Sequence, residues 1–139
     1  AALEHFGGID VWVNNAGIES RHPTHELPLD VWEKTLAVNL TGVFAGCRRA
    51  IDHFLDRKMP GVIINLSSVH EIIPWPHFAD YAASKAGVGM LTKTLALEYA
   101  DRIIGIRAGK IVYDGPSKQV DQAVLDAIYG EDASSEAAV

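Results

Sequence analysis

The chain has 139 residues, of which 48% are hydrophobic and 22% are charged, and its formal net charge is −6. This composition predicts a globular protein large enough to bury a core, and no basic patch favours nucleic acid as a partner. A single cysteine, Cys47, excludes an internal disulfide, and no apolar run reaches membrane-spanning length. Without signal-peptide features at the N-terminus, these observations predict a cytoplasmic location and no membrane partner.

The first fifth of the chain predicts a helix end, a strand and a polar loop. Residues 1–6 are expected to close a helix, and Gly7-Gly8 stops it. Residues 9–13 predict a buried strand, because they are mostly apolar and β-branched. The strand runs into small and amide residues that let a ligand approach the backbone closely, namely Asn14, Asn15, Ala16 and Gly17.

The polar loop that follows, residues 18–28, carries Glu19, His22 and His25. Two loop histidines without a third ligand predict solvated side chains, so no metal is expected. Asp30 and Glu33 then form a capping-box pattern at the start of a long helix reaching about Arg57. Its core-facing stripe is predicted as Leu36, Leu40, Val43, Phe44, Cys47, Ile51, Phe54 and Leu55.

The central stretch of the chain combines a strand, a serine pair and a helix. Residues 61–66 predict a buried strand of a parallel sheet that delivers Ser67 and Ser68. After a loop containing Trp75 between two prolines, a helix is expected from about Asp80 to Ala100. Tyr81 and Lys85 are four residues apart, so they share one face of that helix.

This arrangement suits acid–base chemistry on an alcohol. A phenol is a poor base near neutral pH, and a nearby ammonium favours its deprotonated form. Tyr81 would take the proton of a substrate hydroxyl, and Ser68 would hydrogen-bond the same oxygen. A Tyr/Lys pair by itself is more often an ordinary amphipathic pair with an extended lysine, and the preceding strand and serine pair favour chemistry.

Residues 1–100 resemble the short-chain dehydrogenase/reductase family in Asn14-Asn15-Ala16-Gly17, in Ser68 and in the Tyr81/Lys85 pair. The resemblance implies a partial Rossmann-like, doubly wound parallel α/β sheet whose first βαβ unit is missing. It also implies catalysis by Ser68, Tyr81 and Lys85, with Asn39 holding a water in a proton relay to the lysine. NAD or NADP would lie against residues 14–17, Tyr81 and Lys85, and residues 31–57 and 80–100 would build a homo-oligomer.

Residues 68–76 are similar, more narrowly, to bacterial NAD(P)-dependent glucose 1-dehydrogenases. That similarity implies a small sugar substrate, oxidised at its anomeric hydroxyl, and sugar contacts from Glu19, Ser68, His70 and Trp75. Each contact except that of Ser68 has an alternative: Glu19 as a surface carboxylate, His70 as a satisfied loop histidine, and Trp75 as a loop anchor on the core. Another sugar-alcohol or ketone as substrate would leave the site unchanged.

The family's glycine-rich phosphate turn has no counterpart here, since no Gly-x-x-x-Gly-x-Gly precedes Asn14. The family's later Pro-Gly turn, which faces the nicotinamide, is also replaced by other sequence. We therefore expect these 139 residues on their own to have negligible dehydrogenase activity. The rival hypothesis is a non-catalytic remnant or an interaction module.

Residues 101–139 predict a separate, loosely attached β-hairpin and helix. Two strands flank Ala108-Gly109, Asp114-Gly115-Pro116 is expected to form a turn, and Ser117 is expected to cap a helix through Tyr129. Residues 133–139 are expected to fray. Residues 96–130 are similar to the distal end of ABC-transporter ATPase subunits of phosphonate importers, which places a junction near Ala100. The helix stripe is predicted as Val120, Val124, Leu125 and Ile128.

Overall fold

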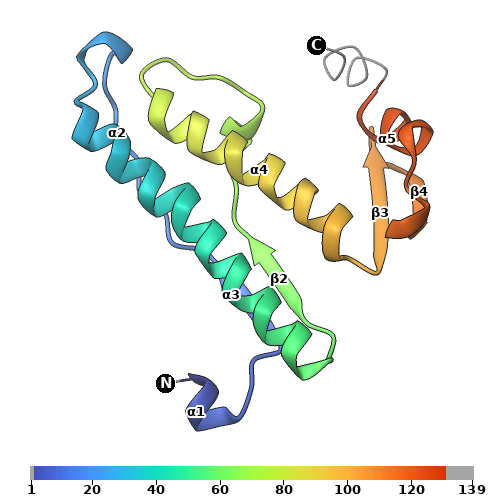
Figure 1. Cartoon of the computed structure of the whole chain (residues 1–139). Coiled ribbons are helices and arrows are strands. Elements are labelled where there is room, and N and C mark those ends of the chain that lie inside the picture. The colour runs from blue at the N-terminus through green and yellow to red at the C-terminus, as the bar shows by residue number, and fades with distance from the viewer. Residues whose placement is uncertain (1, 131–139) are drawn as a thin grey trace. The chain divides into compact units, whose positions relative to one another are not determined.

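A computed structural model describes residues 2–130 of the chain (Figure 1). The chain divides between Leu91 and Thr92 into two compact units, each with its own two-stranded sheet. Helix α1 (Ala2–Phe6) opens the first unit and ends at Gly7, whose φ of +74° suits glycine, as predicted. Within residues 2–130, no helix combines the length and hydrophobicity needed to cross a bilayer.

The sheet of the first unit pairs β1 (Val11–Asn14) with β2 (Val62–Asn65) in parallel. This confirms the predicted parallel α/β arrangement, and it brings Asn14 beside Asn65 at the carboxyl ends of the two strands. Both strands were predicted as buried. That prediction is wrong for the face of the sheet that does not contact α3. Helix α3 packs on the other face, whereas about half of each side chain stays exposed at Val11, Val13, Val62 and Ile64.

The predicted long helix has three continuous parts: α2 (Leu29–Leu36), a π-helical turn η2 (Ala37–Thr41) and α3 (Gly42–Arg57). The predicted capping box is wrong. Helix α2 begins two residues earlier, at Leu29 after Pro28, and no side chain caps it. Asp30 therefore lies inside the first turn, where a carboxylate is favourable beside the positive end of the helix dipole. The predicted end at Arg57 is confirmed, and Lys58 follows in the left-handed region.

The core side of α3 is narrower than the predicted stripe. Val43 and Cys47 are buried as expected, and Ala50 continues their row. Phe44 and Leu55 are about half exposed, so their assignment to the core is wrong. A sheet of two strands covers one row of a helix, and residues at the edge of the apolar stripe stay in solvent.

Helix α4 (Ala79–Tyr99) runs almost as predicted from sequence. Most of its buried side chains are polar or charged. They are Asp80, Ser84 and Lys85, and Val88 is buried beside them. Figure 1 shows α4 as one continuous helix that spans the division of the chain.

Val88 has no exposed surface, and in α4 it is the only large aliphatic side chain that the structure, which describes residues 2–130, shows as buried. Val88→Ala is expected to lower the free energy of unfolding by about 2 kcal/mol, because it removes buried methyl groups and leaves a cavity. Urea denaturation of the chain measures this. The matched control is Met90→Ala on the same helix, where the side chain is 63% exposed and a change within about 0.5 kcal/mol is expected. Equal losses in both variants would contradict the burial.

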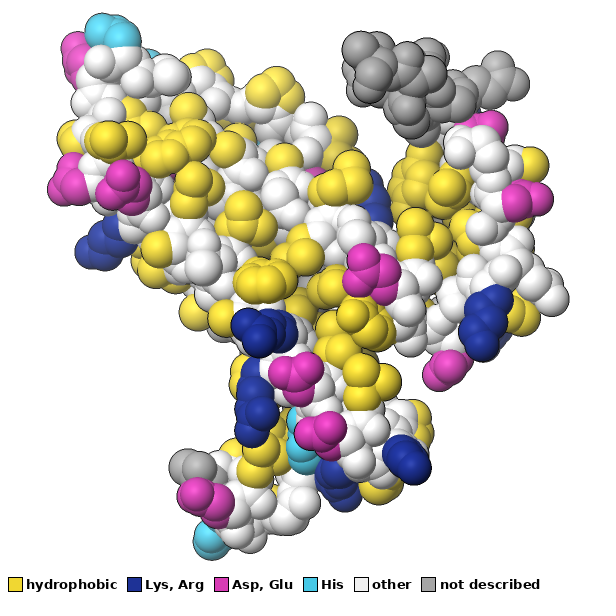
Figure 2. Space-filling view, viewed as in Figure 1, with side chains coloured by type: hydrophobic (Ala, Val, Ile, Leu, Met, Phe, Trp, Pro, Cys, Tyr) yellow, Lys and Arg dark blue, Asp and Glu magenta, His cyan; other side chains and the backbone are white. Residues whose placement is uncertain are grey.

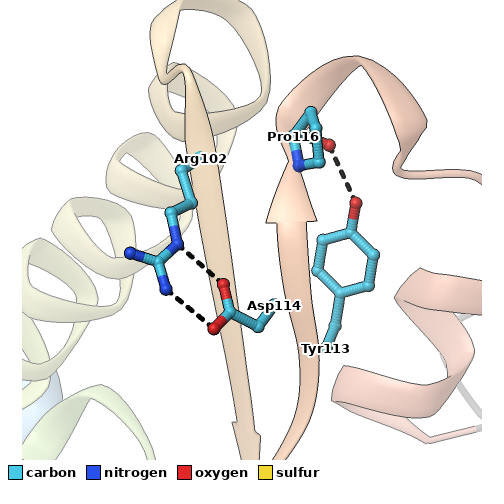
Figure 3. Close-up of polar contacts among 4 residues, drawn as sticks. All are labelled: Arg102, Tyr113, Asp114 and Pro116. Carbon is cyan, nitrogen blue, oxygen red and sulfur yellow. Dashed lines mark hydrogen bonds and ion pairs between the residues drawn. The ribbon is translucent and has the colours of Figure 1, made fainter.

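The second unit holds an antiparallel hairpin of β3 (Arg102–Arg107) and β4 (Lys110–Pro116), which confirms the predicted hairpin. Ala108 and Gly109 both have positive φ angles, as tight hairpin turns require. The turn predicted at residues 114–116 is wrong, because these residues extend β4. Arg102 donates two hydrogen bonds of 2.7 Å to the Asp114 carboxylate across the strands, and Tyr113 donates to the Pro116 carbonyl (Figure 3).

Helix α5 (Gln122–Tyr129) closes the described chain and packs on both hairpin strands. The predicted cap at Ser117 is wrong, because the Ser117 hydroxyl donates to the Ala100 carbonyl and residues 117–119 form the 3₁₀ turn η4 (Ser117–Gln119). Asp121 caps the helix instead, since its carboxylate accepts the Val124 amide at 3.0 Å. The end at Tyr129 is as predicted. The predicted fraying of residues 133–139 lies outside the described residues.

Candidate active site

Lys85 occupies the centre of the candidate site and is only 4% exposed. Its Nζ donates a 2.8 Å hydrogen bond to the carbonyl of Leu66, the residue directly after β2. The same Nζ lies 5.6 Å from the centroid of the Tyr81 ring, one helical turn back. Burial lowers the pKa of Lys85, because the protein replaces part of the hydration of the ammonium. The lysine is therefore held between a strand end and the phenol.

Asn39 is fully buried in the π-helical turn η2. Its side-chain amide pairs with the backbone of Ile18, with Nδ2 donating to the carbonyl and Oδ1 accepting the amide, each at 2.8 Å. Nδ2 also donates to Ser84 Oγ at 3.1 Å, and Ser84 donates to the Tyr81 carbonyl at 2.7 Å. A π turn inserts one residue into a helix, which reorients the side chains that follow. Asn39 thereby joins the loop after β1 to the helix that carries Tyr81.

Gly17 marks where the loop, Asn39 and Lys85 meet. A Cβ placed on Gly17 would lie 3.6 Å from Asn39 Oδ1 and 3.7 Å from Lys85 Nζ. The exposed Gly17 is thus next to a buried ammonium, a combination that fits a polar ligand. Asn14 points elsewhere: it accepts from Trp12 Nε1 and donates to Asn65 Oδ1, each at 2.8 Å. Its side chain therefore ties the two strands together.

Ser68 lies at the start of a short 3₁₀ turn, η3 (Val69–Glu71). Its Oγ accepts the His70 amide at 3.2 Å and caps the turn. The imidazole of His70 makes an edge contact with Tyr81, with the ring centroids 5.8 Å apart. Ser67 donates to the Lys85 carbonyl at 3.2 Å. The serine pair and the Tyr81/Lys85 pair are therefore connected through His70 and Ser67.

His70 is also the centre of an aromatic cluster. Its ring lies 4.7 Å from Trp75 and 5.7 Å from Phe78, and the ring of Phe78 is nearly parallel to it. Sequence reasoning missed Phe78, which had no motif around it to draw attention. Trp75 packs on this cluster and yet stays 58% exposed, so it is no buried anchor. The cluster forms a partly open aromatic surface beside Tyr81.

Glu19 is exposed, and the loop residues on either side of it are held by hydrogen bonds. Ile18 is held by Asn39, and the hydroxyl of Ser20 donates to Asp80 at 2.7 Å. Of the two loop histidines, His25 lies 3.4 Å from the Glu26 carboxylate at the surface, and the His22 backbone amide donates to the His77 carbonyl. Within residues 2–130, no three His, Cys, Asp or Glu side chains are grouped so that they could hold a metal ion.

Asp80 is a further polar residue that sequence reasoning missed. Its side chain is buried beside Tyr81, and Thr35 as well as Ser20 donates a hydroxyl hydrogen bond to it. From sequence it was only the expected start of a helix. Its partners are 60 and 45 residues away along the chain, so no local pattern signals the contact.

A family profile described as short chain dehydrogenase matches residues 1–113. The chain belongs to this family. The matched range includes Ser68, Tyr81 and Lys85. The parallel β1–β2 pair with α3 and α4 is part of the family's α/β architecture.

Two curated relatives and one solved structure show the range of similar proteins. The chain is 77% identical over 108 residues to 3β-hydroxysteroid dehydrogenase 1 of Eggerthella lenta, covering 78% of this chain and 41% of that protein. It is 44% identical over 108 residues to glucose 1-dehydrogenase 2 of Bacillus subtilis, covering 77% and 42%. A gluconate 5-dehydrogenase of Burkholderia cenocepacia, solved with NADP and tartrate, is 39% identical with a TM-score of 0.68, covering 71% and 38%. The chain spans about two fifths of the length of these proteins.

Proposed function

We propose that the chain supplies the acid–base half of a dehydrogenase that moves a hydride between a hydroxyl substrate and NAD or NADP. The observation that carries this proposal is the placement of the buried Lys85 ammonium between the Leu66 carbonyl and the Tyr81 ring, with Asn39 beside it. The family membership and the NADP in the structure of the gluconate 5-dehydrogenase support the cofactor.

Each residue has a role that follows from its position. The deprotonated phenol of Tyr81 accepts the proton of the substrate hydroxyl and becomes neutral, and the Lys85 ammonium favours that deprotonated form beforehand. Ser68 hydrogen-bonds the substrate oxygen, and Asn39 holds the loop after β1 against α4. Asn15, Ala16 and Gly17 present backbone to the cofactor, with Asn14 behind them in the sheet. A nicotinamide cofactor held against residues 15–17 would supply the hydride acceptor for the carbon that carries the hydroxyl.

The substrate that we propose first is a largely apolar secondary alcohol of the 3β-hydroxysteroid type. The 77% identity to the Eggerthella lenta enzyme supports it. So does the chemistry of the surface next to Ser68, where Ile72 is 84% exposed, and Val69, Ile73 and Trp75 are more than half exposed. A fused apolar ring system would cover these side chains, whereas a sugar would leave its hydroxyls against them without partners.

Glucose, which the sequence predicts, is the second candidate. It is supported by the identity of 44% to the Bacillus subtilis enzyme and by the exposed carboxylate of Glu19 beside the fastened Ile18. Under this alternative, Glu19, His70 and Trp75 are the sugar contacts. A carboxylate suits paired sugar hydroxyls, and it is a poor contact for an apolar ring system.

Two chimeras separate the candidates. Residues 1–100 replace the matching segment of the Eggerthella lenta steroid enzyme in one, called the steroid chimera, and of the Bacillus subtilis glucose enzyme in the other, the glucose chimera. We expect the steroid chimera to reduce NAD or NADP with a 3β-hydroxysteroid, and the glucose chimera to show no glucose-dependent reduction. Activity in the glucose chimera alone would favour glucose, and inactivity of both, when both fold, would contradict the dehydrogenase proposal.

The domain boundary is tested with the same proteins. We propose that residues 1–100 form the dehydrogenase part and that residues 101–139 are a hairpin and helix of the ABC-ATPase-like type. The family profile reaches residue 113, so residues 101–113 are the segment that tests this boundary. The change of sequence pattern after Ala100 supports this. A steroid chimera that also carries residues 101–113 should lose activity, because these residues would displace the relative's own segment. Full activity with residues 101–113 included would contradict the boundary.

We also propose a homo-oligomer built through residues 31–57 and 80–100. Hydrophobic side chains gather along the viewer's side of α3 and α4 in Figure 2, and Phe44, Leu55 and Met90 are all about half exposed or more. Two such helical faces would bury these side chains against a second copy. Sedimentation equilibrium of the chain should show a dimer or a larger assembly, and a monomer at all concentrations would contradict the proposal.

A further inference from the structure

Asp80 is a carboxylate buried to 1% exposure in the first turn of α4. Its Oδ2 accepts two hydroxyl hydrogen bonds of 2.7 Å, one from Ser20 and one from Thr35. Its Oδ1 is buried as well and has no hydrogen-bond partner within residues 2–130. A buried charge is costly unless it is hydrogen-bonded, and the bonds from Ser20 and Thr35 offset part of the desolvation cost of Asp80.

The three residues of this cluster come from three different segments. Ser20 lies in the loop after β1, next to Glu19, and Thr35 lies on α2, four residues before Asn39. Asp80 directly precedes Tyr81. The cluster therefore fastens together the segments that carry four of the candidate site residues: Glu19, Asn39, Tyr81 and Lys85.

Hydrogen bonds to the Asp80 carboxylate favour its ionised form. Burial by itself raises the pKa of Asp80, and the hydrogen bonds from Ser20, from Thr35 and from the backbone at Tyr81 and Asp80 together outweigh it, so that the pKa lies below the ordinary value. Hydrogen bonds to an ionised acceptor are also stronger than those between neutral groups. Both hydroxyls are thereby held in one orientation at neutral pH.

We propose that Asp80 is a positioning residue, which fixes the loop around Ser20 and the helix turn of Tyr81 in one arrangement. The proposal deepens the proposed function and rests on it for the catalytic role of Tyr81. Without the carboxylate, the loop keeps the hydrogen bonds at Ile18 and His22. It loses the hydrogen bond from Ser20, which lies between them. Tyr81 and Glu19 would then sample several relative positions, and a displacement of about 1 Å is enough to slow a positioned reaction on the order of 100-fold.

The test uses the full chain and two readouts that need no turnover. The first is amide hydrogen exchange at Ile18 and His22, which flank Ser20 and donate to Asn39 Oδ1 and to the His77 carbonyl. The second is the NMR resonance of ¹³Cζ-labelled Tyr81, assigned by its loss in Tyr81→Phe. The variants are Asp80→Ala, Asp80→Asn and Ser20→Ala. The control is Asp121→Asn, since Asp121 is an exposed cap in the second unit.

In Asp80→Ala we expect exchange at Ile18 and His22 to accelerate on the order of 10-fold, because a charge-assisted anchor is lost. The Tyr81 resonance should shift or broaden, and exchange in β2 should stay unchanged. Asp80→Asn keeps an oxygen that accepts from both hydroxyls, so it should restore most of both signals. Ser20→Ala should accelerate the loop amides and leave the Tyr81 resonance in place, and the control should change neither.

Equal acceleration in β2 would mean a general loss of stability and would overturn the proposal. An unchanged Tyr81 resonance in Asp80→Ala would also overturn it, as would an Asp80→Asn variant as disturbed as Asp80→Ala. Because neither readout involves substrate or cofactor, inactive chimeras would contradict the proposed function and leave these measurements valid.

Discussion

Tyr81→Phe should reduce turnover of the steroid chimera on the order of 10² to 10⁴-fold, because it removes the one atom that accepts the substrate proton. The substitution leaves the ring in place. Its edge contact with His70 and its position 5.6 Å from Lys85 Nζ do not depend on the phenolic oxygen. The rate of cofactor reduction with a 3β-hydroxysteroid measures the effect.

The control for this substitution is Tyr99→Phe. Tyr99 lies on the same helix and is about half exposed, and it is 18 residues from Tyr81 along the chain. Tyr99→Phe should leave the turnover of the steroid chimera unchanged. If Tyr81→Phe retained most of the activity, the proton would be accepted by another group, and the assignment of Tyr81 would be wrong.

Lys85→Met should lower turnover of the steroid chimera on the order of 100-fold, and it should change how the stability of the chain depends on pH. Methionine resembles lysine in length and carries no charge. It removes both the donor to the Leu66 carbonyl and the ammonium near the Tyr81 ring. The activity loss follows because the deprotonated phenol is no longer favoured.

The sign of the pH effect follows from the burial of Lys85. Its pKa in the folded chain is lowered from the ordinary value of 10.5, so in the interval between the two values the unfolded chain binds more protons. The free energy of unfolding must then rise with pH across that interval. Urea denaturation at stepped alkaline pH should show this contribution in the original chain and its absence in Lys85→Met. The exposed control Lys34→Met should keep it. A pH dependence identical in the original chain and in Lys85→Met would contradict the lowered pKa.

Local chemistry alone was enough to predict the elements that carry the candidate site. Tyr81 and Lys85 are four residues apart on a helix, which puts them on one face whatever else surrounds them. The strand at residues 62–65 followed from a short β-branched run, and the hairpin followed from Ala108-Gly109 between two such runs. In each case the signal and the structure involve the same few neighbouring residues, so the sequence by itself determined them.

The tertiary structure decided the features whose partners are distant in sequence. Asn39 lies in a π turn and pairs with Ile18, and the buried Asp80 receives its two hydroxyl hydrogen bonds from Ser20 and Thr35. The cap moved from Ser117 to Asp121 because the serine hydroxyl binds Ala100 instead. Side-chain hydrogen bonds of this kind depend on how segments meet in space, and neither periodicity nor propensity records that.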